Sequence, residues 1–113
     1  MVEFAATGSK IYFNGRIVPE REATVHVLSG AVKYGATVFE GICAYLGDEG
    51  RLTVFRLPEH LLRLQDSMRI MRFEQDWSVS HLTEVVTDVI KANELHEDTH
   101  IRLSAYVLSE GFL

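Results

Sequence analysis

The segment VHVLSGAVKYGATVFEGICAY, residues 25–45, constrains the fold more than any other part of the chain. From Thr37 onward its side chains alternate between the two faces of an extended strand. One face carries Val38, Glu40, Ile42 and Ala44, and the other carries Phe39, Gly41, Cys43 and Tyr45. A glycine between an aromatic ring and a thiol leaves room for a ligand to approach the backbone closely. The second face is therefore predicted to be a pocket wall.

Shorter patterns predict the remaining strands. Asn14-Gly15 favours a tight turn with positive φ angles and so predicts a hairpin. The glycines and acids of Gly47–Gly50 predict a second hairpin loop. The strands expected from these turns and from alternation are Lys10–Phe13, Arg16–Val18, Thr24–Leu28, Thr37–Leu46, Leu52–Arg56 and His100–Val107.

Two amphipathic helices and one short helical segment complete the prediction. Ser29–Tyr34 predicts a short helical turn. Pro58 suits a first helical turn, and Ser78 suits an N-cap of a second helix that ends near Asn93. The apolar stripes expected on the two helices are Leu57, Leu61, Leu64, Met68 and Met71, then Leu82, Val85, Val86, Val89 and Ile90. The order of elements predicts an α+β fold, a mostly antiparallel sheet with two covering helices.

Composition narrows the class of protein. The 113 residues suit one domain, and 47% hydrophobic with 24% charged residues is ordinary for a globular domain. The formal net charge of −5 argues against general affinity for nucleic acid or anionic membrane. Cys43 is the sole cysteine, which excludes an internal disulfide and favours a reducing, cytoplasmic location. The histidines lack zinc-like spacing, and no run approaches the roughly 18 apolar residues of a membrane span. We predict no metal and no membrane.

Three ordered motifs carry a resemblance to a known family. They are HVLSGAVKYGATVFEGICAY, VFRLPEHLLRLQDSMRIMRF and HIRLSAYV. Together they resemble the N-terminal part of the fold-type IV pyridoxal-phosphate aminotransferases, in particular the branched-chain amino acid aminotransferases, over about Ile11 to Phe112. The resemblance implies pyridoxal 5'-phosphate as cofactor, an amino acid and a 2-oxo acid as substrates, and a homodimer.

The family's Schiff-base lysine lies in a C-terminal domain that residues 1–113 do not match. The resemblance therefore implies that residues 1–113 form a single N-terminal small domain without the catalytic lysine. We expect the chain to be a truncation or cleavage product of a longer transaminase, and to be inactive by itself. Lys10, Lys33 and Lys91 do not match the lysine motif.

Arg63 is the predicted cofactor-binding residue. From the pattern alone, Arg63 would form an ion pair on the helix surface, because Glu59 lies four residues before it and Asp66 three residues after it. The resemblance instead implies that it binds the phosphate of pyridoxal phosphate. A guanidinium fork suits phosphate oxygens and stays charged at any working pH.

Arg102 and His100 share one face of the last predicted strand, where two donors side by side suit a carboxylate. A solvated strand face explains the same pattern. The resemblance implies that Arg102 binds the side-chain carboxylate of glutamate or 2-oxoglutarate. His100 stands where the family usually has a tyrosine, which changes the donor that orients the substrate.

Tyr34, Phe39 and Gly41 are the remaining predicted substrate contacts. Buried strand aromatics more often serve as plain core, but the resemblance implies aromatic walls and a glycine around an aliphatic side chain. Cys43 belongs to the same wall and stands where branched-chain enzymes usually carry a basic residue. Glu40 lies on the opposite face, where we predict a structural role, bonding backbone or a basic partner.

Other functions remain open from the sequence. D-amino acid transaminases, (R)-amine transaminases and aminodeoxychorismate lyases share the fold implied by the resemblance. A non-catalytic ligand-binding or interaction module that lost the lysine-bearing half is an alternative of another class.

Overall fold

The N-terminal hairpin forms around the Asn-Gly pair as predicted. In the computed structural model, which describes residues 9–110, β1 (Lys10–Phe13) pairs antiparallel with β2 (Arg16–Pro19). Asn14 and Gly15 have φ angles of 49° and 89°, which a tight turn with matching strand twist requires. A 3₁₀ turn, η1 (Glu20–Glu22), follows.

The prediction of a strand at Thr24–Leu28 is wrong. This segment has no partner strand and ends in a tight turn over Val27 and Leu28 that begins at His26. The Leu28 amide donates to His26 Nδ1 at 3.0 Å, and the Ser29 amide donates to the His26 carbonyl at 2.9 Å. The Leu28 and Ser29 amides therefore find their hydrogen-bond acceptors within the segment and not in a neighbouring strand.

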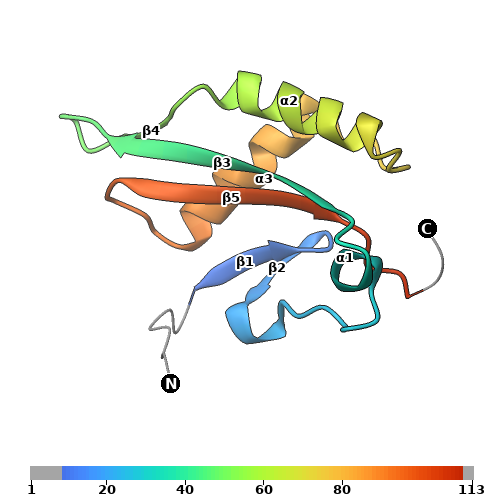
Figure 1. Ribbon diagram of the computed structural model, residues 1–113. Coiled ribbons are helices and arrows are strands. Elements are labelled where there is room, and N and C mark those ends of the chain that lie inside the picture. Colours follow the sequence, from blue (N-terminus) through green and yellow to red (C-terminus); the bar gives the residue numbers. More distant parts are fainter. Residues whose placement is uncertain (1–8, 111–113) are drawn as a thin grey trace.

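A three-stranded antiparallel sheet forms the centre of the molecule, in the order β4-β3-β5 (Figure 1). Its strands are β3 (Thr37–Leu46), β4 (Leu52–Val54) and β5 (Thr99–Tyr106). β5 pairs with β3 from Thr37 to Ala44, whereas β4 pairs with β3 only from Ala44 to Leu46. Among residues 9–110, the N-terminal half of β3 thus has one edge without a partner strand.

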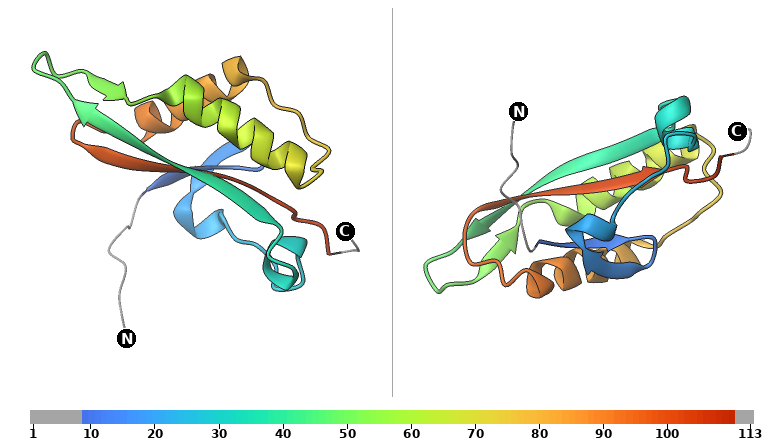
Figure 2. Two further views of the ribbon diagram at one scale, coloured as in Figure 1. Left: turned by 45° about the horizontal axis from the view of Figure 1, so that its top comes forward. Right: turned by 90° about the horizontal axis from the view of Figure 1, so that it is seen from below.

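Two helices cover one face of this sheet (Figure 2). They are α2 (Leu57–Ile70) and α3 (Val79–Ala92). Ser78 caps α3, since its Oγ accepts a hydrogen bond from the His81 amide at 3.0 Å. The core formed between helices and sheet consists of Leu61, Leu64, Met68, Leu82 and Ala105. Of the predicted stripes, Leu61, Leu64, Met68, Leu82, Val85 and Val86 are buried, and Leu57, Val89 and Ile90 are half-buried. Met71, after the end of α2, is exposed, so its place in the stripe is wrong.

Two hydrogen-bonded junctions attach the outer elements to the central sheet. Asn93, at the end of α3, accepts from the Lys10 amide at 2.8 Å and donates to the Lys10 carbonyl at 2.9 Å, which fixes β1. The short helix α1 (Gly30–Lys33) is fixed to the segment after β5, because the Ala31 amide donates to the Val107 carbonyl at 2.8 Å.

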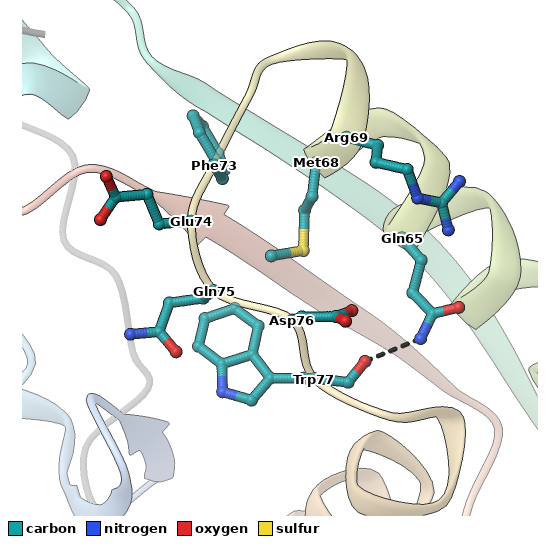
Figure 3. Close-up of a pocket in the computed structure, with 8 residues that line it drawn as sticks. All are labelled: Gln65, Met68, Arg69, Phe73, Glu74, Gln75, Asp76 and Trp77. Carbon is teal, nitrogen blue, oxygen red and sulfur yellow. Dashed lines mark hydrogen bonds between the residues drawn. The ribbon is translucent and has the colours of Figure 1, made fainter.

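A cavity of about 270 Å³ lies between the C-terminal half of α2 and residues 71–77 (Figure 3). Gln65 Nε2 closes one side by donating to the Trp77 carbonyl at 2.7 Å. None of the predicted site residues lines this cavity. Within residues 9–110, every helix is too short or too polar to cross a membrane.

Candidate active-site half

The outer face of the sheet gathers five of the predicted site residues. In the β3–β5 register, Gly41 lies opposite Arg102 and Cys43 lies opposite His100. Phe39 lies on the same face, two residues before Gly41. The helices cover the other face. Alternation in two strands, combined with one register, therefore brings Phe39, Gly41, Cys43, His100 and Arg102 together on the uncovered face.

Arg102 lies over the ring of Phe39. Its guanidinium carbon is 3.9 Å from the ring centroid, and its Nε donates to Ser104 Oγ at 3.3 Å. A guanidinium stacked on an aromatic face is held in place by the ring and keeps its other N–H groups for further partners. The pair therefore presents a fixed positive charge on the open face, next to an apolar ring that is half exposed.

His100 covers the space that Gly41 leaves open. A Cβ atom built on Gly41 would lie 2.9 Å from His100 Nε2 and 3.3 Å from His100 Cε1. The imidazole thus leans along the strand from its position opposite Cys43 toward Gly41. Sequence reasoning assigned both residues to the substrate site but missed this contact, because it depends on the register between two strands about 60 positions apart.

The polar neighbour of the Cys43 thiol is the phenol of Tyr45. A hydrogen bond with the Cys43 thiol raises the pKa of Tyr45 above its ordinary value, with nearby negative charge and burial acting in the same direction. The Tyr45 ring also packs edge-on against Phe55, with centroids 6.3 Å apart. The Tyr45 phenol is therefore uncharged near neutral pH, whereas Arg102 at the other end of the face carries a positive charge.

Tyr34 lies on a different element, at the C-terminal cap of α1. Its ring is 53% exposed and is contacted by Lys33 Nζ, 5.2 Å from the ring centroid. The β3–β5 register therefore does not bring Tyr34 to the other predicted substrate contacts.

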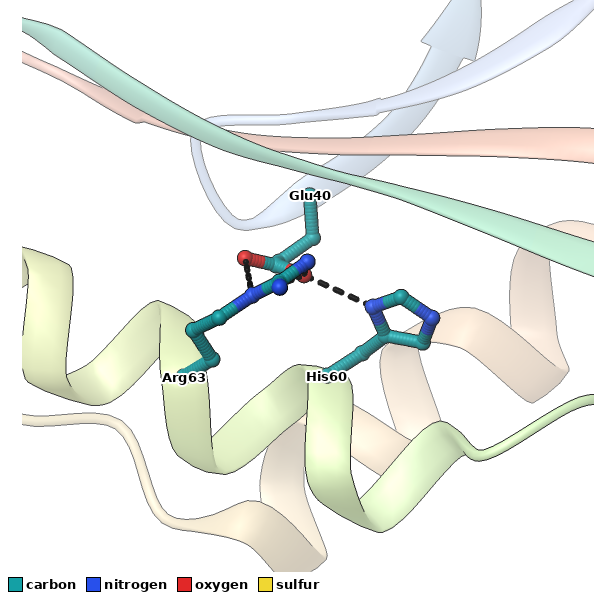
Figure 4. A network of polar contacts seen from close by, with 3 residues as sticks. All are labelled: Glu40, His60 and Arg63. Carbon is teal, nitrogen blue, oxygen red and sulfur yellow. Dashed lines mark hydrogen bonds and ion pairs between the residues drawn. The ribbon is translucent and has the colours of Figure 1, made fainter.

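Arg63 lies on the helix-covered side of β3, where it binds the buried carboxylate of Glu40 (Figure 4). Arg63 Nε donates to Glu40 Oε2 at 2.9 Å, and Nη2 donates to Glu40 Oε1 at 2.7 Å. His60 Nδ1 lies 2.7 Å from the same Oε1. An ionised carboxylate only accepts, so Nδ1 carries the hydrogen.

The surface pair considered for Arg63 from the sequence is not the one that forms. Asp66 instead bonds Arg69, with Oδ1 and Nη1 2.6 Å apart, on the exposed side of α2. Arg63 turns toward β3 because α2 packs directly above Glu40. The basic partner predicted for Glu40 is thus confirmed, and it is Arg63.

This network sets the protonation of its two charged groups. Glu40 is only 4% exposed, and the hydrogen bonds from Arg63 hold the pKa of its carboxyl below the ordinary 4.5, against the opposing effect of burial. His60 lowers the pKa of Glu40 further. Reciprocally, Glu40 raises the pKa of Arg63. Both groups are therefore charged near neutral pH.

The Arg63 guanidinium keeps an edge that suits an oxyanion. Its side chain is 69% exposed although its Nε and Nη2 are bound to a buried acid. Of the five N–H groups of a guanidinium, the carboxylate faces the Nε–Nη2 edge, which leaves both N–H groups of Nη1 and one of Nη2 at the outer end. That outer end fits a phosphate group bidentately.

Curated relatives of this chain are aminotransferases. The chain is 47% identical over 101 residues to the branched-chain-amino-acid aminotransferase of Salmonella typhimurium. The alignment covers 89% of this chain and 32% of the relative, so the chain spans about a third of that protein's length. No protein-family model matches the chain.

Solved structures with the same fold point to the same proteins. The branched-chain aminotransferase of Thermoproteus uzoniensis, solved with norvaline, matches with a TM-score of 0.86 and 39% identity over 93% of this chain and 35% of that one. The branched-chain amino acid aminotransferase of Thermobaculum terrenum in its PLP form matches with a TM-score of 0.79 and 34% identity, over 88% and 33% of the two chains. In sequence and in fold, the chain is thus related to the N-terminal third of the fold-type IV branched-chain aminotransferases.

Proposed function

We propose that this chain forms the N-terminal domain of a pyridoxal-phosphate-dependent transaminase. The enzyme moves an amino group between an amino acid, in the first place a branched-chain one, and a 2-oxo acid. The observation that carries the proposal is the free outer end of the Arg63 guanidinium. Its Nε–Nη2 edge is bound to Glu40, beside the part of β3 that lacks a partner strand on one side. The relatives described above support the class of reaction.

Arg63 would hold the phosphate of the cofactor with its free N–H groups. Pyridoxal phosphate, when bound, supplies the electron sink that lets an amino group be exchanged. The chain's three lysines lie on β1, α1 and α3, and none lies on β3 or β5, the strands of the outer sheet face. We therefore place the Schiff-base lysine in a further domain beyond residues 1–113.

The outer sheet face would bind the substrate. Arg102, stacked on Phe39, offers a fixed cation to a carboxylate, and the ring offers an apolar surface to an aliphatic side chain. Arg102 carries a permanent positive charge on this face, so we assign substrate carboxylates to the Arg102 end. Tyr34 would join this site from α1 or from a second subunit of a homodimer. A cytoplasmic location is part of the proposal, in keeping with the single free cysteine.

The test uses the longer protein that carries this chain. We expect a pyridoxal-phosphate absorbance band and amino transfer from leucine, isoleucine or valine to 2-oxoglutarate. Arg63→Gln should weaken cofactor binding roughly ten- to a hundred-fold, the range for a lost hydrogen bond to a charged group. Arg69→Gln, on the same helix but paired only with exposed Asp66, is the matched control and should bind the cofactor normally.

Substrate screening separates the alternatives. Transfer from D-amino acids or amines in place of L-amino acids would keep the cofactor and overturn the substrate assignment. Absence of both the absorbance band and cofactor binding would overturn the transaminase and leave a binding module.

A further inference from the structure

A buried acid and a partly buried histidine hold the exposed arginine of the proposed cofactor site. Glu40 accepts from Arg63 Nε, from Arg63 Nη2 and from His60 Nδ1, all at 2.7–3.1 Å. Glu40 is 4% exposed, whereas the Arg63 side chain is 69% exposed. The carboxylate thus reaches Arg63 from the protein interior and leaves the outer end of the guanidinium in solvent.

We infer that Glu40 is a positioning residue which, together with His60, orients Arg63 so that its outer N–H groups face the phosphate of the cofactor. This inference rests on the proposed function. It assigns a task to two residues that do not themselves touch the cofactor.

The edge of the guanidinium that Glu40 occupies supports this role. A guanidinium has one side edge, Nε and Nη2, and one outer end, Nη1 and Nη2, and each suits a bidentate oxyanion. Glu40 binds the side edge, so the planar group can rotate neither about its long axis nor away from β3. The outer end is left for the second anion, and the two anions need not compete for the same N–H groups.

The energetic reason lies in the freedom of an arginine side chain. An unrestrained arginine carries about 2 kcal/mol of rotamer entropy, which an exposed side chain loses when it binds a ligand. Glu40 removes much of that freedom before the ligand arrives, which is how preorganisation raises affinity. A purely structural ion pair would gain nothing from leaving three of the five N–H groups of the guanidinium at its outer end.

His60 fixes the carboxylate in turn. Its Nδ1 donates to Oε1, the oxygen that Arg63 Nη2 also binds, and its side chain is 20% exposed at the surface of α2. His60 and Arg63 are one helical turn apart, so both approach Glu40 from one face of α2. With the carboxylate plane held from two directions, the Nε–Nη2 edge of Arg63 has one orientation to match.

The experiment measures how much the protein prefers a phosphorylated ligand. The apoprotein of the longer chain is titrated with pyridoxal 5'-phosphate and with pyridoxal, and the ratio of the two dissociation constants gives the phosphate preference. We expect Arg63→Gln to lower this ratio roughly ten- to a hundred-fold. We expect Glu40→Gln to lower it about ten-fold, as loss of an orienting partner does in metal sites. Asp66→Asn, which removes an exposed pair on the same helix, should leave it unchanged.

A double variant shows whether Glu40 acts through Arg63. In the Arg63→Gln background, Glu40→Gln should have no further effect on the ratio. A fall in the ratio that persists in this background, or an unchanged ratio in Glu40→Gln alone, overturns the positioning role while the proposed function stands. An unchanged ratio in Arg63→Gln overturns the proposed phosphate contact itself.

Pyridoxal binding serves as the internal measure of folding, since general damage lowers affinity for both ligands. If Glu40→Gln does not fold, His60→Leu decides, because this residue is nearer the surface. A lower phosphate preference in His60→Leu, restored by His60→Asn, whose amide offers a donor close to the Nδ1 position, supports the inference. An unchanged preference in His60→Leu overturns it.

Discussion

Glu40 couples the stability of the fold to pH. The hydrogen bonds from Arg63, and then the one from His60, hold the pKa of this carboxyl below its ordinary 4.5 in the folded state, against the opposing effect of burial. A carboxyl whose folded pKa is below its unfolded pKa contributes stability above the unfolded value. That stability is lost as the pH falls through the folded pKa.

This sign gives a prediction for acid unfolding. We expect the free energy of unfolding of the unsubstituted protein to fall more steeply below about pH 4.5 than that of Glu40→Gln, which cannot gain this proton. Urea unfolding at a series of pH values measures both slopes. Asp66→Asn is the control for a carboxylate in an exposed pair, and equal slopes for the unsubstituted protein and Glu40→Gln would contradict the prediction.

Gly41 is predicted to tune the substrate face and not the fold. In Gly41→Ala the new Cβ would lie 2.9 Å from His100 Nε2, the far end of an exposed side chain that can swing away. We expect the free energy of unfolding to change by less than about 1 kcal/mol, within the range of surface substitutions. The displaced imidazole would alter KM for the amino acid more than affinity for the cofactor.

Removing the imidazole tests that explanation. His100→Ala eliminates the clash, so Gly41→Ala added to His100→Ala should change KM less than it does in the unsubstituted protein. Equal effects in both backgrounds would mean that Gly41 contacts the substrate directly.

At the scale of elements, the helix α3 depends on its cap. Ser78 Oγ accepts from the His81 amide at 3.0 Å, in a loop that leads from residues 71–77 into the helix. We expect Ser78→Ala to lower the free energy of unfolding by about 1 kcal/mol, the usual effect of losing an N-cap. Urea unfolding measures it. Ser80→Ala, two residues later on the exposed side of the first turn, should cost nothing, and an equal loss in both variants would rule out the cap as the cause.

Elements with a local cause were predictable from the sequence. Asn14-Gly15 specified its hairpin, Ser78 its helix, and alternation from Thr37 the long central strand. Thr24–Leu28 failed because alternation alone does not supply a partner strand, and His26 satisfied the local amides instead. Alternation also predicted which residues share the outer sheet face.

Contacts between distant elements were not predictable in the same way. Glu40 and Arg63 are 23 residues apart and meet because α2 crosses above β3. The position of His100 over Gly41 depends on the β3–β5 register. Sequence patterns assign residues to faces, but packing and register decide which residues on those faces touch.

At the scale of the whole molecule, the described fold is less compact than a typical domain of this length. Its radius of gyration is 15.1 Å, whereas a compact domain of 113 residues would have roughly 13 Å. The two sheets share no ladder, and a groove of about 730 Å³ lies among β1, α3 and β5. Large apolar side chains remain exposed in the segment from Val25 to Tyr34, which we call the apolar segment; they are Val25, Val27, Leu28, Val32 and Tyr34.

Exposed apolar surface of this kind drives association. We therefore expect the 113-residue polypeptide, produced alone, to self-associate as its concentration rises and to bind a hydrophobic dye, without transaminase activity. Sedimentation velocity measures the association. Val27 is 67% exposed at the centre of the apolar segment, so Val27→Glu should shift the equilibrium toward monomer.

Ile70→Glu is the matched control, because Ile70 is 80% exposed but lies at the end of α2, outside the apolar segment. If both substitutions reduce association equally, added charge and not the apolar segment is responsible. If only Val27→Glu does so, the same substitution in the longer protein decides what covers the segment. If the longer protein is a dimer, loss of that dimer would assign the segment to an interface with a second subunit. An unchanged oligomeric state with a lower free energy of unfolding would assign it to an interface with a further domain of the same chain.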